Sequence, residues 1–113
     1  MCGIVGIVSA SELPPEDRQR VIAMRDSIVH RGPDAEGIAV DGQAALGHRR
    51  LSIVDLATGK QPLANEDETV WISFNGEIYN HRDLRRELEG LGHAYRTQSD
   101  TESIVHAYEQ WGD

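Results

Sequence analysis

The sequence predicts an α+β domain, because strand-like runs and helix-like segments occur together along its 113 residues. Short apolar runs of strand length are found at residues 4–8, 37–40, 44–48 and 70–74. Apolar residues at helical spacing are found at residues 16–29, 80–91 and 99–111. A chain of this length forms one domain with a modest core.

The first strand-like run, residues 4–8, lies just after Cys2, the single cysteine of the chain. Its near-continuous branched residues predict a strand that is buried on both faces. Such a strand would hold Cys2 at the end of a rigid element. Gly3 and Gly6 would let another backbone or a ligand come close.

A helix and a pair of strands are expected next. Pro15, followed by two acidic residues, favours a helix start, and the apolar spacing extends this helix to Val29. The turn sequence at residues 31–34 ends it near His30. Residues 37–40 and 44–48 are then predicted to form strands joined by a tight turn at Asp41-Gly42.

Two arginines, Arg49 and Arg50, follow these strands and leave two interpretations open. They could mark a solvated strand end, which composition alone favours. Alternatively, one guanidinium could lie at the edge of a pocket, where its planar fork binds a carboxylate through two hydrogen bonds.

The predicted strand at residues 70–74 runs into Asn75-Gly76, which also has two interpretations. Asn-Gly after a strand is a strong signal for a hairpin, although only a very short second arm would fit. The other interpretation is a turn whose asparagine amide and glycine N–H point at a developing oxyanion.

Two helices are predicted in the last third of the chain. Asn80 is a candidate N-cap of the first, with Tyr79 and Leu84 placed for a hydrophobic staple. A short strand is expected at residues 93–97. Ser99 and Glu102 then fit a capping box for the last helix, and Asp100 has an ordinary role as an acid in its first turn.

Composition excludes several classes of function. The net charge of −8 argues against nucleic acid and anionic membrane surfaces as partners. No apolar stretch is long enough to span a membrane. A single cysteine forms no internal disulfide, and a working thiol needs a reducing compartment, so we expect a cytoplasmic protein. The five histidines are scattered without metal-binding spacing, so no metal site is expected.

Cys2 itself has both a structural and a functional interpretation. A lone cysteine is most often a small buried hydrophobe. Removal of Met1, however, would leave Cys2 with both a thiol and a free α-amine. An amine of this kind, with an ordinary pKa of about 7.7–8.0, can serve as the base for its own nucleophile.

Six motifs, taken together, resemble the amino-terminal glutaminase domain of class II (N-terminal nucleophile) glutamine amidotransferases. They cover nearly the whole chain, in family order, at residues 1–6, 30–34, 47–55, 61–63, 74–80 and 99–102. The His-Arg-Gly-Pro-Asp and Arg-Leu-Ser-Ile-Val-Asp motifs are most similar to the asparagine-synthetase branch of that family. The resemblance implies the αββα sandwich of N-terminal nucleophile hydrolases, of which residues 1–113 would form only the front part.

The resemblance also implies a site for L-glutamine. Cys2 would attack the side-chain amide, form a thioester and release ammonia, and water would then free glutamate. The Asn75 side chain and the Gly76 N–H would hold the oxyanion. The remaining implied contacts are Arg50 on the α-carboxylate, the backbone of Leu51, Ser52, Ile53 and Val54 along the pocket, and Glu77 and Asp100 on the α-ammonium.

A second domain, outside these residues, is the implied partner. It would use ATP and Mg²⁺ to activate aspartate and would receive the ammonia, so no cofactor is expected within residues 1–113. We expect these residues to be inactive alone. The alternatives are an amidotransferase with a different ammonia acceptor and a non-catalytic glutamine-binding module. The oligomeric state stays open, a homodimer included.

Overall fold

Three antiparallel strands form the main sheet, in the spatial order β1-β3-β2. The structure is a computed structural model that describes residues 2–52 and 59–113. Its sheet consists of β1 (Gly3–Val8), β2 (Ala35–Asp41) and β3 (Ala44–Arg50). The β2–β3 hairpin turns at Gly42, whose φ of 52° suits glycine. The predicted strand pair is therefore confirmed, with each strand longer than expected.

Helix α1 (Pro15–Ser27) covers one face of this sheet, and the short 3₁₀ helix η1 (Val29–Arg31) follows it. Val21 is fully buried where α1 meets the sheet. A Cβ at Gly47 of β3 would lie 2.8 Å from a methyl carbon of Val5 and 3.2 Å from one of Val21. Glycine at this position therefore lets the helix approach the sheet closely.

The prediction that the first strand is buried on both faces was wrong. Ile4 and Val8 of β1 are 51% and 79% exposed, whereas Gly3 is buried and Val5 is half-buried. Helix α1 and the residue after it cover the face to which Gly3 and Val5 belong, where a Cβ at Gly3 would lie 2.6 Å from Ile28. The strand is therefore covered on one face and exposed on the other, although its sequence is apolar throughout.

A short ribbon lies on the other side of the sheet. It pairs β4 (Leu63–Ala64) with β5 (Trp71–Ile72), and β4 was not predicted. The expected strand at 70–74 is short because the backbone N–H of Phe74 donates to the side-chain oxygen of Gln61 at 2.6 Å. A Cβ at Gly37 would come within 1.8 Å of the Gln61 carbonyl oxygen, so glycine in β2 permits this close approach.

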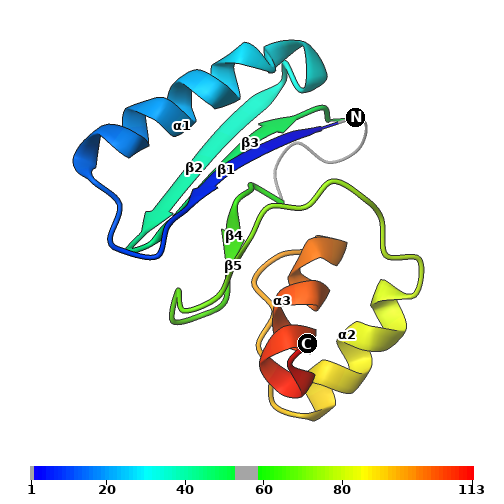
Figure 1. Cartoon of the computed structure of the whole chain (residues 1–113). Coiled ribbons are helices and arrows are strands. Elements are labelled where there is room, and N and C mark those ends of the chain that lie inside the picture. Colours follow the sequence, from blue (N-terminus) through cyan, green and yellow to red (C-terminus); the bar gives the residue numbers. More distant parts are fainter. Residues whose placement is uncertain (1, 53–58) are drawn as a thin grey trace.

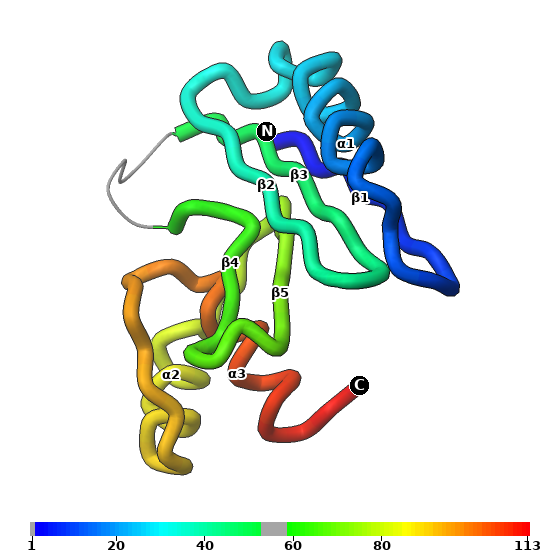
Figure 2. The backbone as a smooth tube through the Cα atoms, turned by 90° about the vertical axis from the view of Figure 1, so that its left-hand side faces the viewer, coloured from blue at the N-terminus to red at the C-terminus, as the bar shows by residue number. Residues whose placement is uncertain are grey.

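Helices α2 (His81–Gly90) and α3 (Asp100–Trp111) pack on each other, and α3 also packs on β4 and β5. Leu88 and Val105 are the buried apolar residues of these two helices. The layers therefore run from α1 through the three-stranded sheet and the β4–β5 ribbon to α2 and α3, as the two views show (Figure 1, Figure 2). The α+β class predicted from the sequence is confirmed.

Three local predictions near these helices need correction. Tyr79 is 94% exposed, so the expected hydrophobic staple does not form. Asn80 is at the N-cap of α2, but its side chain makes no capping hydrogen bond. Residues 93–97 are not a strand, because the N–H groups of Arg96 and Thr97 both donate to the Glu102 carboxylate at 2.7 Å. Those groups are therefore committed to a side chain rather than to a neighbouring strand.

The cap of α3 follows the prediction in part. The Ser99 hydroxyl accepts a hydrogen bond from the N–H of Thr101 at 3.3 Å, as a capping residue should. Glu102 does not close the capping box, since it binds the preceding segment instead. None of the helices in the described residues is long and apolar enough to cross a lipid bilayer.

Candidate active site around Cys2

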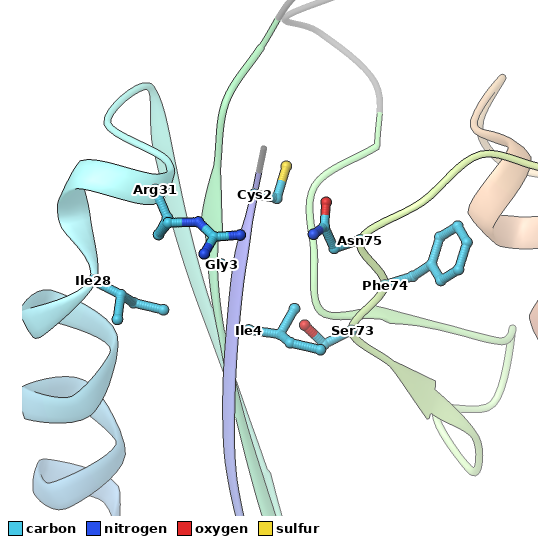
Figure 3. Close-up of a pocket in the computed structure, with 8 residues that line it drawn as sticks. All are labelled: Cys2, Gly3, Ile4, Ile28, Arg31, Ser73, Phe74 and Asn75. Atoms are coloured by element: carbon cyan, nitrogen blue, oxygen red, sulfur yellow. The ribbon is translucent and has the colours of Figure 1, made fainter.

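A cavity of about 420 Å³ opens between the start of β1 and the loop after β5. Figure 3 shows Cys2 reaching it from the β1 side and Asn75 from the opposite loop. Eight residues line the cavity: Cys2, Gly3, Ile4, Ile28, Arg31, Ser73, Phe74 and Asn75. A space of this size is sufficient for a small-molecule ligand.

The position of Cys2 follows from the pairing of β1 with β3. Gly3 pairs with Arg49, so the chain that leaves β3 passes directly beside Cys2. The backbone N–H of Leu51 donates a hydrogen bond to Cys2 Sγ at 3.4 Å, and Sγ lies 4.0 Å from the Leu51 carbonyl oxygen. These contacts hold the half-buried thiol at the cavity rather than in the core.

The Asn75-Gly76 turn is anchored on both sides. On one side, the Phe74 N–H donates to Gln61. On the other, the Ile78 N–H donates to Asp100 Oδ2 at 2.8 Å. Residues 75–80 lead through a turn into α2 without a second strand, so the hairpin interpretation was wrong. The turn instead presents the Asn75 side chain to the cavity (Figure 3).

The structure brings only some of the predicted site residues to this cavity. Of the described residues, Cys2 and Asn75 line it, and Leu51 contacts the Cys2 sulfur. Gly76 follows in the same turn, where a Cβ would lie 2.6 Å from the Phe74 ring.

The remaining glutamine-binding candidates are outside the lining of the cavity: Arg50, Ser52, Glu77 and Asp100. Arg50 ends β3, and its guanidinium is 3.7 Å from the place where a Cβ of Gly59 would be. The backbone N–H of Ser52 donates to Asp34 Oδ2 at 2.7 Å. Ile53 and Val54 are outside the described residues.

Arg31 and Ser73 line the cavity although sequence reasoning gave neither of them a role. Figure 3 shows the Arg31 side chain extending from the end of η1, the segment that follows α1, towards β1 and Gly3. A Cβ at the adjacent Gly32 would lie 2.3 Å from the backbone carbon of Arg49. This tight contact between η1 and the end of β3 places Arg31 at the cavity, and membership of the 30–34 motif was its only signal in the sequence.

The first arginine of the Arg49–Arg50 pair is structural, not a solvated strand end. Arg49 is largely buried and pairs with Asp26 at 2.7 Å and Glu36 at 3.0 Å. Arg25 of α1 pairs with the same two carboxylates, at 2.9 and 3.2 Å. The hydrogen bonds from Arg25 and Arg49 hold the pKa of Asp26 below its usual value. This four-residue network ties α1 to β2 and β3 beside the cavity.

His48 is buried directly behind the lining residue Ser73. It is 1% exposed, and its Nδ1 lies 2.9 Å from Ser73 Oγ, whereas Nε2 is buried without a hydrogen-bond partner. Burial, assisted by the positive charge of Arg50, lowers the pKa of His48 from 6.5 to about 4. The imidazole is therefore neutral at neutral pH and holds the β5 loop against the main sheet.

The depressed pKa of His48 predicts acid-sensitive folding. Above pH 6.5 the imidazole is neutral in both states, whereas between pH 6.5 and about 4 only the unfolded chain takes up its proton. This difference removes about 3 kcal/mol of unfolding free energy across that range. His48→Asn should reduce the loss of unfolding free energy between pH 6.5 and about 4 by that amount. The measurement is denaturant titration at a series of pH values. The exposed His30→Asn is the control, and an equal effect of both substitutions would contradict the assignment.

Comparison with known proteins shows the family to which the chain belongs. The chain belongs to the glutamine amidotransferase domain family, whose model matches residues 1–113. It is 46% identical, over its whole length, to the asparagine synthetase [glutamine-hydrolyzing] of Sandersonia aurantiaca. It is 48% identical, over 98% of its length, to asparagine synthetase [glutamine-hydrolyzing] 1 of Bacillus subtilis (strain 168). The chain spans 21% and 18% of these relatives, about a fifth of their length.

Proposed function

We propose that residues 1–113 form the glutamine-hydrolysing part of an amidotransferase of the asparagine-synthetase type. The observation that carries the proposal is the meeting of Cys2 and Asn75 at one cavity, from parts of the chain far apart in sequence. A nucleophile facing an amide donor across a small cavity is the arrangement that acyl transfer requires. The relatives, which are named as glutamine-hydrolysing asparagine synthetases, support the same substrate.

The proposed reaction begins with attack of Cys2 Sγ on the side-chain carbonyl carbon of L-glutamine. The α-amine of Cys2, freed by removal of Met1, accepts the thiol proton and passes it to the leaving nitrogen. The C–N bond breaks, ammonia leaves and a thioester remains on Cys2. Water, deprotonated by the same amine, then attacks the thioester, which releases glutamate and restores the thiol.

Two donors in the turn after β5 are proposed to bind the oxyanion of each tetrahedral intermediate. Asn75 would donate from its side-chain amide, and Gly76 from its backbone N–H. The anchoring of this turn by Gln61 and Asp100 supports the role, because preorganised donors need no rearrangement as charge develops.

The α-carboxylate and α-ammonium of glutamine need groups of opposite charge on the two sides of the ligand. We assign Arg50 to the carboxylate, the backbone of residues 51–54 to the wall of the same pocket, and Glu77 and Asp100 to the ammonium. Support comes from proximity along the chain: Arg50 precedes the Leu51 that contacts Cys2, and Glu77 follows the Asn75-Gly76 turn. Arg31, which lines the cavity itself, adds a further positive charge there.

The proposal extends to the complete protein. The observed order of layers supports a front portion of the αββα sandwich of N-terminal nucleophile hydrolases. Released ammonia would pass to a synthetase domain that uses ATP and Mg²⁺ to amidate aspartate, and a different acceptor is the alternative. The working thiol requires a reducing compartment such as the cytoplasm.

The proposal is tested by treating the intact protein with an electrophilic diazo-ketone analogue of glutamine and mapping the adduct by mass spectrometry. We expect one label on the Cys2 sulfur, an amino terminus without Met1, and protection of Cys2 by excess L-glutamine. Labelling that avoids Cys2, or that glutamine does not prevent, would refute the proposal. A retained Met1 together with glutamine binding but no label would instead identify a non-catalytic binding module.

A further inference from the structure

A cluster of metal-ligating side chains lies on α3 and the segment before it, among residues that do not line the Cys2 cavity. His93, His106 and Glu109 each offer one ligand atom, and these atoms all lie within 4.8 Å of one another. His106 and Glu109 are three positions apart on α3, which places them on one face of that helix. His93 reaches them from the chain between α2 and α3.

The interatomic distances suit a small ion after a modest adjustment. Glu109 Oε2 lies 2.8 Å from His106 Nδ1 and 3.6 Å from His93 Nδ1. Around a tetrahedral zinc ion with bonds of about 2.0–2.1 Å, neighbouring ligand atoms lie roughly 3.3 Å apart. These two distances bracket that value, so Glu109 Oε2 is placed to share an ion with both imidazoles.

The outer atoms of two of the three ligands, His93 and Glu109, have a hydrogen-bond partner. His93 Nε2 lies 3.0 Å from Gln110 Oε1, and Asn65 Nδ2 donates to Glu109 Oε1 at 2.7 Å. His106 Nε2 lies 3.5 Å from Glu102 Oε1. Histidines that bind metals characteristically donate their second N–H to an oxygen in this way, and that bond orients the ring.

Three carboxylates lie close to the buried ring of His106, and this negative surrounding favours a cation beside the ring. Its side chain is 1% exposed, and Nε2 has no hydrogen-bond partner. Nε2 faces the carboxylates of Glu102 and Glu66, at 3.5 and 3.9 Å. A cation on Nδ1 would leave the proton on Nε2, where it can be donated to Glu102.

We propose that His93 Nδ1, His106 Nδ1 and Glu109 Oε2 bind a divalent transition-metal ion of the zinc class. Two imidazoles with one carboxylate favour zinc, whereas calcium and magnesium prefer oxygen ligands alone. The side chains of His93 and Glu109 are 16% and 23% exposed, so solvent water can reach these ligands. The ion would link the segment before α3, through His93, to His106 and Glu109 of α3.

This site departs from the expectation that no metal binds. The linear spacing of residues 93, 106 and 109 matches no familiar metal motif, so the sequence alone does not predict this site. Because the ion would act on the fold rather than on the thiol, failure of this proposal would leave the proposed glutaminase activity untouched.

The test is zinc binding by the intact protein after its metals have been removed with a chelator. We expect one equivalent of Zn²⁺ that His93→Ala and Glu109→Gln weaken at least roughly tenfold, the scale of defects at metal sites. Co²⁺ in the wild type should show the visible absorption of a tetrahedral site, and both variants should lose it. His30→Ala, which removes an exposed histidine elsewhere, is the matched control.

The comparison of variants cancels zinc bound by other parts of the protein. Equal uptake by wild type and His93→Ala, or an equal loss in His30→Ala, would overturn the site and leave the cluster as a hydrogen-bond network only. His93→Ala and Glu109→Gln are preferred to a change at His106, whose buried ring is also needed for packing. Absence of the Co²⁺ spectrum in the wild type would overturn the proposal without any substitution.

Discussion

Cys2→Ala in the intact protein is expected to abolish glutamine-dependent activity while the protein retains ammonia-dependent synthesis. Alanine removes the sulfur that forms the thioester, and no other thiol or hydroxyl nucleophile is proposed at this cavity. Loss of a nucleophile that acts with its base typically costs at least roughly 10⁴-fold in kcat. The measurement is glutamate release and product formation, with glutamine and ammonium supplied in separate assays.

The ammonia-dependent assay is also the control for folding of the Cys2→Ala variant. Cys2 is half-buried and contacts Leu51, so the thermal unfolding midpoint should be compared as well. Equal loss of both activities, or a large drop in that midpoint, would mean that Cys2 has a structural role.

Asn75→Ala is expected to lower kcat for glutamine hydrolysis by about 10²–10³-fold with little change in KM. The reason is that the Asn75 amide is proposed to bind charge that develops only in the transition state. The measurement is steady-state glutaminase kinetics. Binding of the intact substrate should be nearly unaffected, because the other proposed contacts hold its charged ends.

The matched control for this substitution is Asn80→Ala, five residues further along. Asn80 is exposed, and its side chain makes no capping hydrogen bond. A similar fall in kcat for both variants would place the effect in the stability of the loop and helix rather than in the oxyanion. A rise in KM alone for Asn75→Ala would make Asn75 a ground-state binding residue.

Part of the candidate site could be predicted from the sequence, but the full set of residues that line the cavity could not. The strand after Cys2 and the turn at Asn75-Gly76 are visible as local patterns, and motif order suggested that they act together. Arg31 and Ser73 were missed because their places at the cavity depend on close packing. Arg31 is placed by the close contact between Gly32 and the end of β3, two segments that are distant along the chain.

Two fold predictions failed for a comparable reason. The apolar first strand indicated burial on both faces, but a single helix covers it, and Ile4 and Val8 remain exposed. Residues 93–97 have the composition of a strand, but Glu102 of α3 takes up two of their N–H groups. Neither outcome can be read from the segment itself, because each depends on what the rest of the chain places beside it.

By itself the sequence determined the α+β class, the hairpin of β2 and β3, the three α-helices and Ser99 as the N-cap of α3. These features depend on side-chain periodicity, turn residues and first-turn polar groups, all of which act over a few neighbouring residues. Only the tertiary structure decided which residues share the Cys2 cavity, where His48 is buried, and that His93 meets His106 and Glu109. Those arrangements arise from packing between distant segments, which no local pattern encodes.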